Sequence, residues 1–553
     1  MTDHAWVVGL EGLLERPAAG RVWPACVALL LAALAAVVWW IGHAPQSSYP
    51  WSSAILLDGG WRVALGQVPH QDFHSPVGFG YLGLIATPMR AWGAGIDAIA
   101  QAVALTVPLV GMAAWWIASR RMSAVAAAVA TTWIALVWCS VGTLGSLGLA
   151  DITYGGHYSR LCWALMALVM IAVAAPARGG GMAWEWLLLG AVAGALCVTK
   201  ITFAAAAGAM LAIMLVLRPG LPRWAAAVCL AGGWAGLQLL AWLASGGGSL
   251  IGYLADLAAV GRANTTGMPS FLLVEVLSLD AVPAAALAAV LLLLGPSLGG
   301  PGAILRWTGL AALGACGLLL SGTSGCETMT PTLVLLPVAG CLLAGAWFAA
   351  DPLRPRHAWL VPALLLSLLV LVGDCVRLGR PLASLARERL APPVYALASA
   401  LDGPYHGRRF LLSGMDPAAG DQPLTSLTRN AAAVTGEAYL HYVRSGCAAI
   451  QVAKGGDGCR VLSLDFANPF PFTMRLPPPR GDLIYWHVGR NVGAASHPSP
   501  AALFADVDLV IEPVRPIVAE SLAFKREAYL PWLREHAVVA STSPWWNIWK
   551  IIR

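Results

Sequence analysis

The chain has 553 residues, of which 58% are hydrophobic and only 11% are charged. Soluble globular proteins carry roughly 25% charged residues, so an ordinary soluble enzyme is excluded. The net charge of +6 contains no block of lysines or arginines, and nucleic acid is therefore not an expected partner.

The hydrophobic residues are unevenly distributed along the chain. Long apolar runs fill residues 23–376, whereas charged residues return at the density of a soluble protein from Arg377 onward. This pattern predicts an α-helical polytopic membrane domain at residues 23–376, with a short N-terminal segment at 1–22. Residues 377–553 are expected to form one small water-exposed domain, a size within the usual domain range.

A membrane span needs about 20 mainly apolar residues. The sequence predicts eleven spans: Trp23–Ile41, Ile96–Ile117, Met122–Val141, Leu161–Ala175, Trp184–Val198, Ile201–Val216, Trp224–Leu243, Ala281–Leu298, Leu305–Leu320, Pro331–Phe348 and Trp359–Val376. The stretch Val77–Trp92 is also apolar, but it is short and contains Pro88 and three glycines. We expect it to lie along or dip into the outer membrane interface.

The arginines set the orientation. If Val77–Trp92 does not cross, the short loops that carry arginine fall on the same side as Arg16 and Arg21 of the N-terminus. That side is the cytoplasm by the positive-inside rule. An odd number of spans then places the C-terminal domain outside, in the periplasm of a Gram-negative cell, with the spans in the inner membrane. Because the cytoplasmic loops are short, functional residues are expected on the outer face.

The first outer loop, residues 42–95, is the segment richest in candidate residues. It predicts an amphipathic interfacial helix at Ala54–Gly66, which carries Asp58 and Arg62 four residues apart on one face. An extended turn with Asp72 and His74 follows. Acids and histidines at a bilayer surface are costly to hold near lipid and by default mark a functional site. The alternative is a solvated loop with a helix-surface ion pair.

The turn resembles two motifs of membrane glycosyltransferases. Leu65-Gly66-Gln67-Val68-Pro69-His70-Gln71-Asp72-Phe73 is similar to a Leu-x-Gly-x-x-Pro-Tyr-x-Asp-Phe element of many bacterial members. Asp72-Phe73-His74-Ser75-Pro76-Val77-Gly78 resembles the Asp-x-His-Pro-Pro-Leu-Gly segment of the protein O-mannosyltransferase branch, family 39. Both belong to the GT-C superfamily, whose order of one span, an acidic outer loop with two juxtamembrane helices and further spans is also similar.

The resemblance implies a polyprenyl-phosphate sugar as donor and a carboxylate as general base. In the family the first carboxylate stands at a point that falls here near Trp51, Ser52 and Ser53, none of which is acidic. Asp58 is the nearest substitute and ranks first, with Asp72 or Asp151 as alternatives. Asp58 and Asp72 are therefore the predicted catalytic residues.

The second outer loop adds Asp151 and His157. An Asp in this loop of GT-C enzymes helps to orient the acceptor or binds a metal, so the resemblance implies such a role for Asp151, His157 and His74. Asp72, Asp151 and His157 are the residues that would hold a divalent ion, although so few ligands are weak evidence for one. The alternative is ordinary capping of the loop at Gly155-Gly156.

Lys200 is the only lysine of the membrane half, at a junction of two spans that faces outward in the predicted topology. An ammonium at this interface suits the phosphate of a lipid donor. A lysine that reaches out to water is an equally simple interpretation. Arg160 and Arg262 are further candidates for phosphate binding.

The sequence predicts a small α/β fold for the C-terminal domain. Strands are predicted at Arg409–Leu412, Ala448–Val452, Arg460–Asp465, Leu483–His487 and Val507–Glu512, with a final edge strand at residues 538–549. Helices are predicted at Arg380–Ala400, at Asn430–Arg444 and at Ser521–His536, the last with Ser521 as N-cap. Cys447 and Cys459 either close a disulfide in an oxidising compartment or remain free thiols.

These observations favour a hexosyl or pentosyl transferase that moves a sugar from a polyprenyl-phosphate donor to a glycan, lipid or protein acceptor. A transporter or flippase is the first alternative, but no pair of interrupted spans recurs in two halves. A lipid-linked glycan ligase or polymerase is the second, and a non-catalytic scaffold is the third. The acidic first loop distinguishes them, because only the transferase needs Asp58 and Asp72 near the bilayer.

Overall fold

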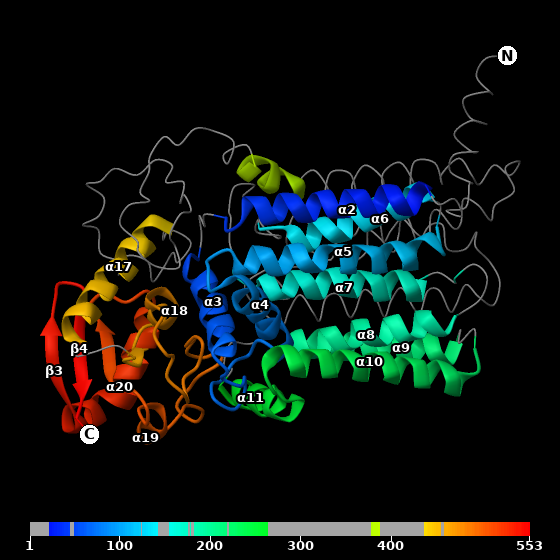
Figure 1. Cartoon of the computed structure of the whole chain (residues 1–553). Helices are drawn as coiled ribbons and strands as arrows, with labels where there is room; N and C mark the ends of the chain where they lie inside the picture. Colours follow the sequence, from blue (N-terminus) through cyan, green and yellow to red (C-terminus); the bar gives the residue numbers. More distant parts are fainter. Residues whose placement is uncertain are drawn as a thin grey trace, which may run out of the picture.

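A computed structural model describes residues 22–44, 49–122, 124–141, 154–174, 177, 182–217, 221–263, 378–386, 436–454 and 458–552. Figure 1 shows a bundle of long helices with a smaller domain at one of its ends. The bundle helices are α2 (Val22–Ile41), α5 (Ala98–Ser119), α6 (Ala124–Cys139), α7 (His157–Ala174), α8 (Ala183–Thr199), α9 (Ile201–Leu217) and α10 (Arg223–Ser245). We refer to the end that meets the C-terminal domain as the domain end.

Three described helices, α2, α5 and α10, are long and apolar enough to cross a membrane, and four shorter ones are apolar over 10–17 residues. The helices agree in position with the predicted spans from Trp23 to Leu243. The four spans predicted between Ala281 and Val376 lie outside the described residues, so the total of eleven stays a prediction. Glu185 at the start of α8 pairs with Arg121 just after α5, which places these two helix ends on the same side, as predicted.

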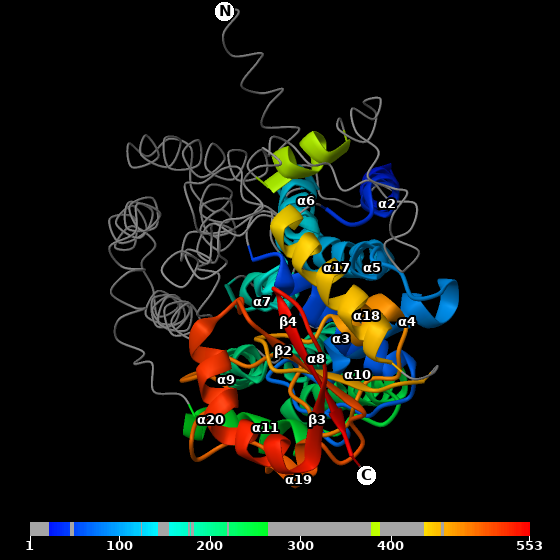
Figure 2. The same cartoon turned by 90° about the vertical axis from the view of Figure 1, so that its left-hand side faces the viewer.

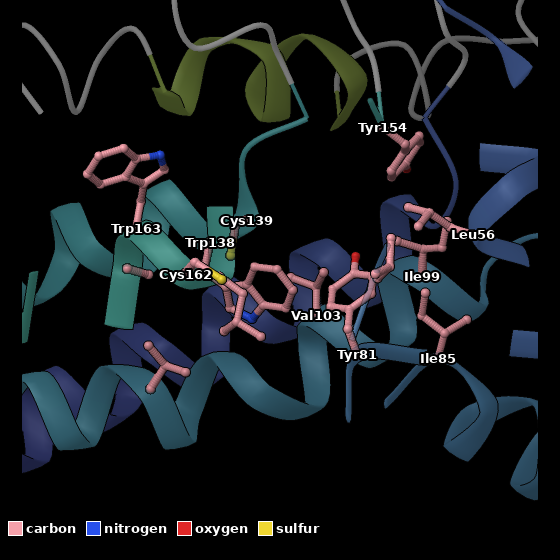
Figure 3. Close-up of a cluster of buried hydrophobic side chains, with 14 of the residues drawn as sticks. Leu56, Tyr81, Ile85, Ile99, Val103, Trp138, Cys139, Tyr154, Cys162 and Trp163 are labelled. Carbon is pink, nitrogen blue, oxygen red and sulfur yellow. The ribbon is translucent and has the colours of Figure 1, made fainter. Parts of the chain in front are cut away.

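Glycine allows the closest helix contact of the bundle. Gly190 of α8 and Gly233 of α10 face the backbone of the opposite helix: a Cβ on Gly190 would lie 2.0 Å from the carbonyl oxygen of Leu230, and one on Gly233 would lie 1.8 Å from that of Leu187. Small residues of this kind let helix backbones approach in membranes. Elsewhere in the bundle, Trp138 of α6 donates its indole N–H to Thr106 of α5 and lies against the His157 ring of α7, within a cluster of buried side chains (Figure 3).

Two short helices lie at the domain end, as predicted for the first outer loop. They are α3 (Trp51–Ala64) and α4 (Phe79–Trp92), the latter with Pro88 inside it. Figure 1 shows α3 lying across the ends of the bundle helices. The prediction of an amphipathic interfacial helix was wrong for α3, because Asp58 and Arg62 are buried along with most of its apolar residues. The C-terminal domain covers the face that would otherwise meet water.

The C-terminal domain confirms the predicted α/β class. Its described elements are α17 (Gly436–Ala453), β1 (Val461–Ser463), α18 (Phe470–Met474), α19 (Pro500–Leu503), β2 (Leu509–Pro513), α20 (Ala519–His536), β3 (Ala537–Thr542) and β4 (Trp546–Ile551). The sheet order is β1-β2-β4-β3, with β1 parallel to β2 and the other pairs antiparallel. Val510 and Ile511 of β2 are fully buried, as expected for a central strand.

Several local predictions for this domain need correction. Residues 448–452 belong to α17 and not to a strand, since Tyr439, Tyr442, Val443 and Ile450 recur at helical spacing and are buried together. Residues 483–487 form only isolated bridges. The final segment is a hairpin in which β3 is the edge and β4 is internal.

The structure also tests the predicted helix cap and the possible disulfide of the C-terminal domain. Ser521 does not cap α20, because its hydroxyl donates to the carbonyl of Trp486. Cys447 and Cys459 are both free thiols, so the disulfide alternative is not the one the structure adopts. The strand predicted at Arg409–Leu412 lies outside the described residues, and the helix predicted at Arg380–Ala400 is described only at 378–386.

Candidate functional site

The turn of the first outer loop is tied to the C-terminal domain by backbone hydrogen bonds. The Gly481 N–H donates to the Asp72 carbonyl at 2.7 Å, and the His74 N–H donates to the Asp482 carbonyl at 2.9 Å. The Ile484 N–H then donates to the His74 carbonyl at 3.1 Å, which makes a short parallel bridge. Figure 2 shows the C-terminal domain in front of the domain end of the bundle. The turn is therefore held from the side of the C-terminal domain as well as from the bundle.

Asp72 closes the turn and remains partly exposed. Its carboxylate accepts the backbone N–H of Val68 at 2.8 Å. The Nε of Arg480, from the C-terminal domain, lies 3.6 Å from the other carboxylate oxygen, and the Asp72 side chain is 22% exposed. Of the two predicted catalytic carboxylates, Asp72 is the one that solvent can reach.

Asp58 is instead part of a buried ion cluster. The Arg62 Nε lies 2.7 Å from Asp58, and the Arg62 Nη2 lies 3.3 Å from Asp482, with all three side chains at most 2% exposed. Arg62 also donates to the carbonyl of Pro479. Burial raises the pKa of Asp58 to about 6, against the attraction of Arg62, and the nearby Asp482 adds to the rise. Two carboxylates thus share one guanidinium under the C-terminal domain.

Asp256 was not predicted, yet it makes the densest set of polar contacts near the turn. It lies on α11 (Leu250–Ala263). Its carboxylate accepts from Nδ1 of His70 and from Nδ1 of His74, both at 2.7 Å, and from the Ser75 N–H at 3.0 Å. Burial alone would raise the pKa of Asp256, but the two histidine hydrogen bonds outweigh it and lower the pKa to about 2.

Lys200 lies at the turn between α8 and α9, where the sequence placed it. Its Nζ is 3.4 Å from the Ser159 hydroxyl and lies over the rings of Tyr158 and Phe203 at 5.7 and 5.4 Å. Cation–π contacts of this kind attract an ammonium to the faces of aromatic rings. The turn touches the start of α4, because the Gly78 N–H donates to the carbonyl of Thr199 at 3.1 Å. Lys200 and the Asp72 turn therefore belong to one end of the bundle.

His157 and Arg160 begin α7 and are fully buried. Nδ1 of His157 shares a hydrogen bond with the Tyr81 hydroxyl at 2.7 Å, and Arg160 donates to the carbonyl of Ser140. His157 and Tyr154 also line a small pocket together with residues of α2, α5 and α6. These contacts give both residues places in the core behind the turn.

The remaining predicted site residues are dispersed. Arg262 is exposed in the last turn of α11, and Asp151 lies outside the described residues. Within the described part of the chain, no group of three or more His, Cys, Asp or Glu side chains is placed to hold a metal ion. A divalent ion with Asp72, Asp151 and His157 as ligands stays a prediction.

Sequence reasoning missed Asp256, Arg480 and Asp482. Asp256 is an acid inside an apolar run, a signal that was available in the sequence near Arg262. Arg480 and Asp482 had no such signal, since they stand in an ordinary polar stretch of the C-terminal domain. Only the fold brings them against the first loop.

No protein-family model matches the chain, and no curated protein matches it significantly. Similar solved structures include ArnT from Cupriavidus metallidurans bound to undecaprenyl phosphate, with 13% identity and a TM-score of 0.42, covering 94% of this chain and 97% of that one. The apo state of the same protein gives 14% and 0.39 over the same shares. The arabinofuranosyltransferase AftD from Mycobacteria gives 13% and 0.40, over 96% of this chain and 41% of that one. At these values the likeness assigns neither a family nor an activity.

Proposed function

We propose that the protein is a membrane glycosyltransferase that moves one sugar from a polyprenyl-phosphate donor to a glycan, lipid or protein acceptor. The observation that carries the proposal is the partly exposed Asp72, held in a fixed turn at the domain end of the bundle, with the ammonium of Lys200 at the same end. A carboxylate that can take a proton and a cation that can meet a phosphate are the two groups that this reaction needs.

In the proposed reaction Asp72 is the general base. It takes the proton of the acceptor hydroxyl as that oxygen attacks the anomeric carbon, and the bond from this carbon to the phosphate oxygen breaks. Polyprenyl phosphate leaves with the electron pair. The hydrogen bond from the Val68 N–H and the nearby Arg480 hold the Asp72 carboxylate in place in the turn.

Asp58 supports the general base Asp72 indirectly, by stabilising the fold around it. It is buried against Arg62, which also grips the C-terminal domain through Asp482 and Pro479. An acceptor hydroxyl would have to displace that contact to reach Asp58. We therefore assign Asp58 to holding the C-terminal domain over the turn, and the proton transfer to Asp72.

Lys200 is proposed to meet the phosphate of the donor. The leaving group is already a phosphate and needs countercharge more than it needs an acid. Arg160 and Arg262 are weaker partners, since Arg160 is buried against Ser140 and Arg262 lies at the far end of α11. The site is proposed to lie on the periplasmic face of the inner membrane, where lipid-linked sugars are presented and nucleotide sugars are absent.

The proposal is tested by lipid analysis of cells that lack the protein. Loss of a transferase should cause one polyprenyl-phosphate sugar to accumulate, and mass spectrometry of the lipid extract identifies its sugar as a hexose or pentose. Wild-type protein should clear the lipid, whereas Asp72→Asn expressed at the same level should not. If no lipid-linked sugar accumulates, or if Asp72→Asn clears it as well as the wild type, the proposal is wrong.

A further inference from the structure

Helix α11 grips the Asp72 turn although it is far away in the sequence. Asp256 accepts three hydrogen bonds from the turn. Tyr253, one helical turn earlier, lies against the His70 ring with the ring centroids 4.9 Å apart, and its hydroxyl donates to the carbonyl of Pro76. Gly252 lies against His70 so closely that a Cβ would come within 3.0 Å of its carbonyl oxygen. One face of α11 is therefore shaped to the segment from His70 to Pro76.

His70 has an unfavourable backbone conformation and an unsatisfied side-chain nitrogen inside this contact. Its φ is +66°, a backbone region that residues with a side chain rarely adopt. Its side chain is fully buried, and its Nε2 has no hydrogen-bond partner among the described residues. Strained and unsatisfied groups of this kind persist where the surroundings enforce them, and they cluster at functional sites. The Asp256 carboxylate is the group that enforces this one.

His74 is the exposed member of the same cluster. Its side chain is 43% exposed, and its Nδ1 is committed to Asp256, which leaves Nε2 as the hydrogen-bonding atom available to a substrate. The charged groups that face His74 are Asp256 from α11 and Asp482 from the C-terminal domain. The hydrogen bond to Asp256 raises the pKa of His74, against the effect of partial burial.

We propose that Asp256 is a positioning residue of the transferase. By accepting from both histidines and from Ser75 N–H, it fixes the tautomers of His70 and His74 and holds the turn that carries Asp72 at a set distance from the bundle. His74 Nε2 is thereby presented to the substrate two residues from the base. We call the contact of Asp256 with His70, His74 and Ser75 the clamp. The inference rests on the proposed function for its chemistry, but the clamp itself can be measured without an activity assay.

The clamp is tested first by histidine C2–H exchange with mass spectrometry on the full chain in lipid nanodiscs. This measurement gives the pKa of His74 in the wild type and in Asp256→Asn, which keeps the size of the side chain. We expect a pKa above the ordinary value in the wild type and a fall toward that value in the variant. An unchanged pKa would overturn the clamp, whether or not the protein transfers sugar.

The positioning role is tested by transfer kinetics, with the lipid that accumulates in cells lacking the protein as donor. Asp256→Asn should lower kcat about 10- to 100-fold, the range found when a group that orients a histidine is removed, with a smaller change in KM. His74→Gln should lower kcat similarly, and the double variant should be no worse than the single ones. Additive effects, or full activity of Asp256→Asn with a shifted His74 pKa, would overturn the role while leaving the proposed function intact.

The control is Glu535→Gln, on an exposed position of α20. If Asp256→Asn fails to fold, His74→Gln still tests the proposal, because it removes only the exposed member of the cluster. Normal kcat in that variant would count against a role for the presented Nε2. Absence of transfer by the wild type would instead refute the proposed function, and the exchange experiment would still decide the clamp.

Discussion

Arg62 joins two parts of the molecule that are more than 400 residues apart. It contacts Asp58 in its own helix, and Asp482 and the Pro479 carbonyl in the C-terminal domain. Taking three charges out of water is costly, and the arrangement holds because each carboxylate has the guanidinium within reach. Removing the cation would leave the buried Asp58 without its ion-pair partner, whereas Asp482 would keep only the hydrogen bond from the Trp486 indole N–H among these contacts.

Arg62→Met should therefore destabilise the protein by about 3–5 kcal/mol, the range for breaking a buried ion pair. Thermal unfolding of the purified protein measures the loss. Arg480→Met is the matched control, because the Arg480 side chain is 65% exposed beside Asp72 and should change stability by less than about 1 kcal/mol. Equal effects of the two substitutions would show that the Arg62 cluster does not hold the domain.

The His74–Asp256 pair should make stability depend on pH. The folded pKa of His74 lies above its ordinary value, so the pair contributes fully below about pH 6.5 and the contribution is lost as pH rises through the folded pKa. Because His74 is nearly half exposed, the contribution should be no more than about 1 kcal/mol. Unfolding midpoints of the wild type and His74→Gln should converge as the pH rises above about 6.5, and a difference that stays constant with pH would contradict the pairing.

At the scale of helices, the contact between α4 and the α8–α9 turn places Lys200. Gly78 precedes α4 and lies against the backbone of Val198, so that a Cβ there would fall 2.1 Å from the Val198 carbonyl oxygen. The obstacle is backbone, which no change of rotamer can move aside. Gly78 is thus a position where the close approach itself requires glycine.

Gly78→Ala should displace the turn that carries Lys200. We expect a loss of stability of about 1–3 kcal/mol and reduced sugar transfer, measured by thermal unfolding and by lipid turnover. Gly208→Ala in α9 is the control, since a Cβ there meets nothing within 4 Å, and it should stabilise the helix by about 0.5–1 kcal/mol. If both substitutions behave alike, the close contact does not matter.

The sequence predicted the positions of the helices better than it predicted which of their residues are buried. Apolar runs located α2 and α5–α10, and the Gly-Pro interruption of Val77–Trp92 marked α4 as a short helix. The ion pair Asp58–Arg62 was predicted, but its burial was not, because periodicity shows that a helix has a polar face and does not show what covers that face. Ala448–Val452 was misassigned for a related reason: a short apolar run fits a strand or one turn of a buried helix.

At the scale of the whole molecule, the C-terminal domain completes the site. Backbone hydrogen bonds of residues 481–484 extend the Asp72 turn, Gln67 donates to the Pro478 carbonyl, and Trp61 donates to the Leu476 carbonyl. These contacts could not be predicted, because contacts between residues 400 positions apart leave no local pattern in the sequence. Asp72, His74 and Lys200 were predicted from motif and composition, whereas Asp256, Arg480 and Asp482 needed the fold.

Conversion of a purified lipid donor tests the central claim most directly. Full-length protein in nanodiscs is given the polyprenyl-phosphate sugar that accumulates in cells lacking it, together with a membrane extract as acceptor source, and the release of free polyprenyl phosphate is followed by mass spectrometry. The wild type and Glu535→Gln should release it, and Asp72→Asn should be slower by about 10²–10⁴-fold, the usual contribution of a general base. Release by Asp72→Asn at the wild-type rate, or none by the wild type, would contradict the account.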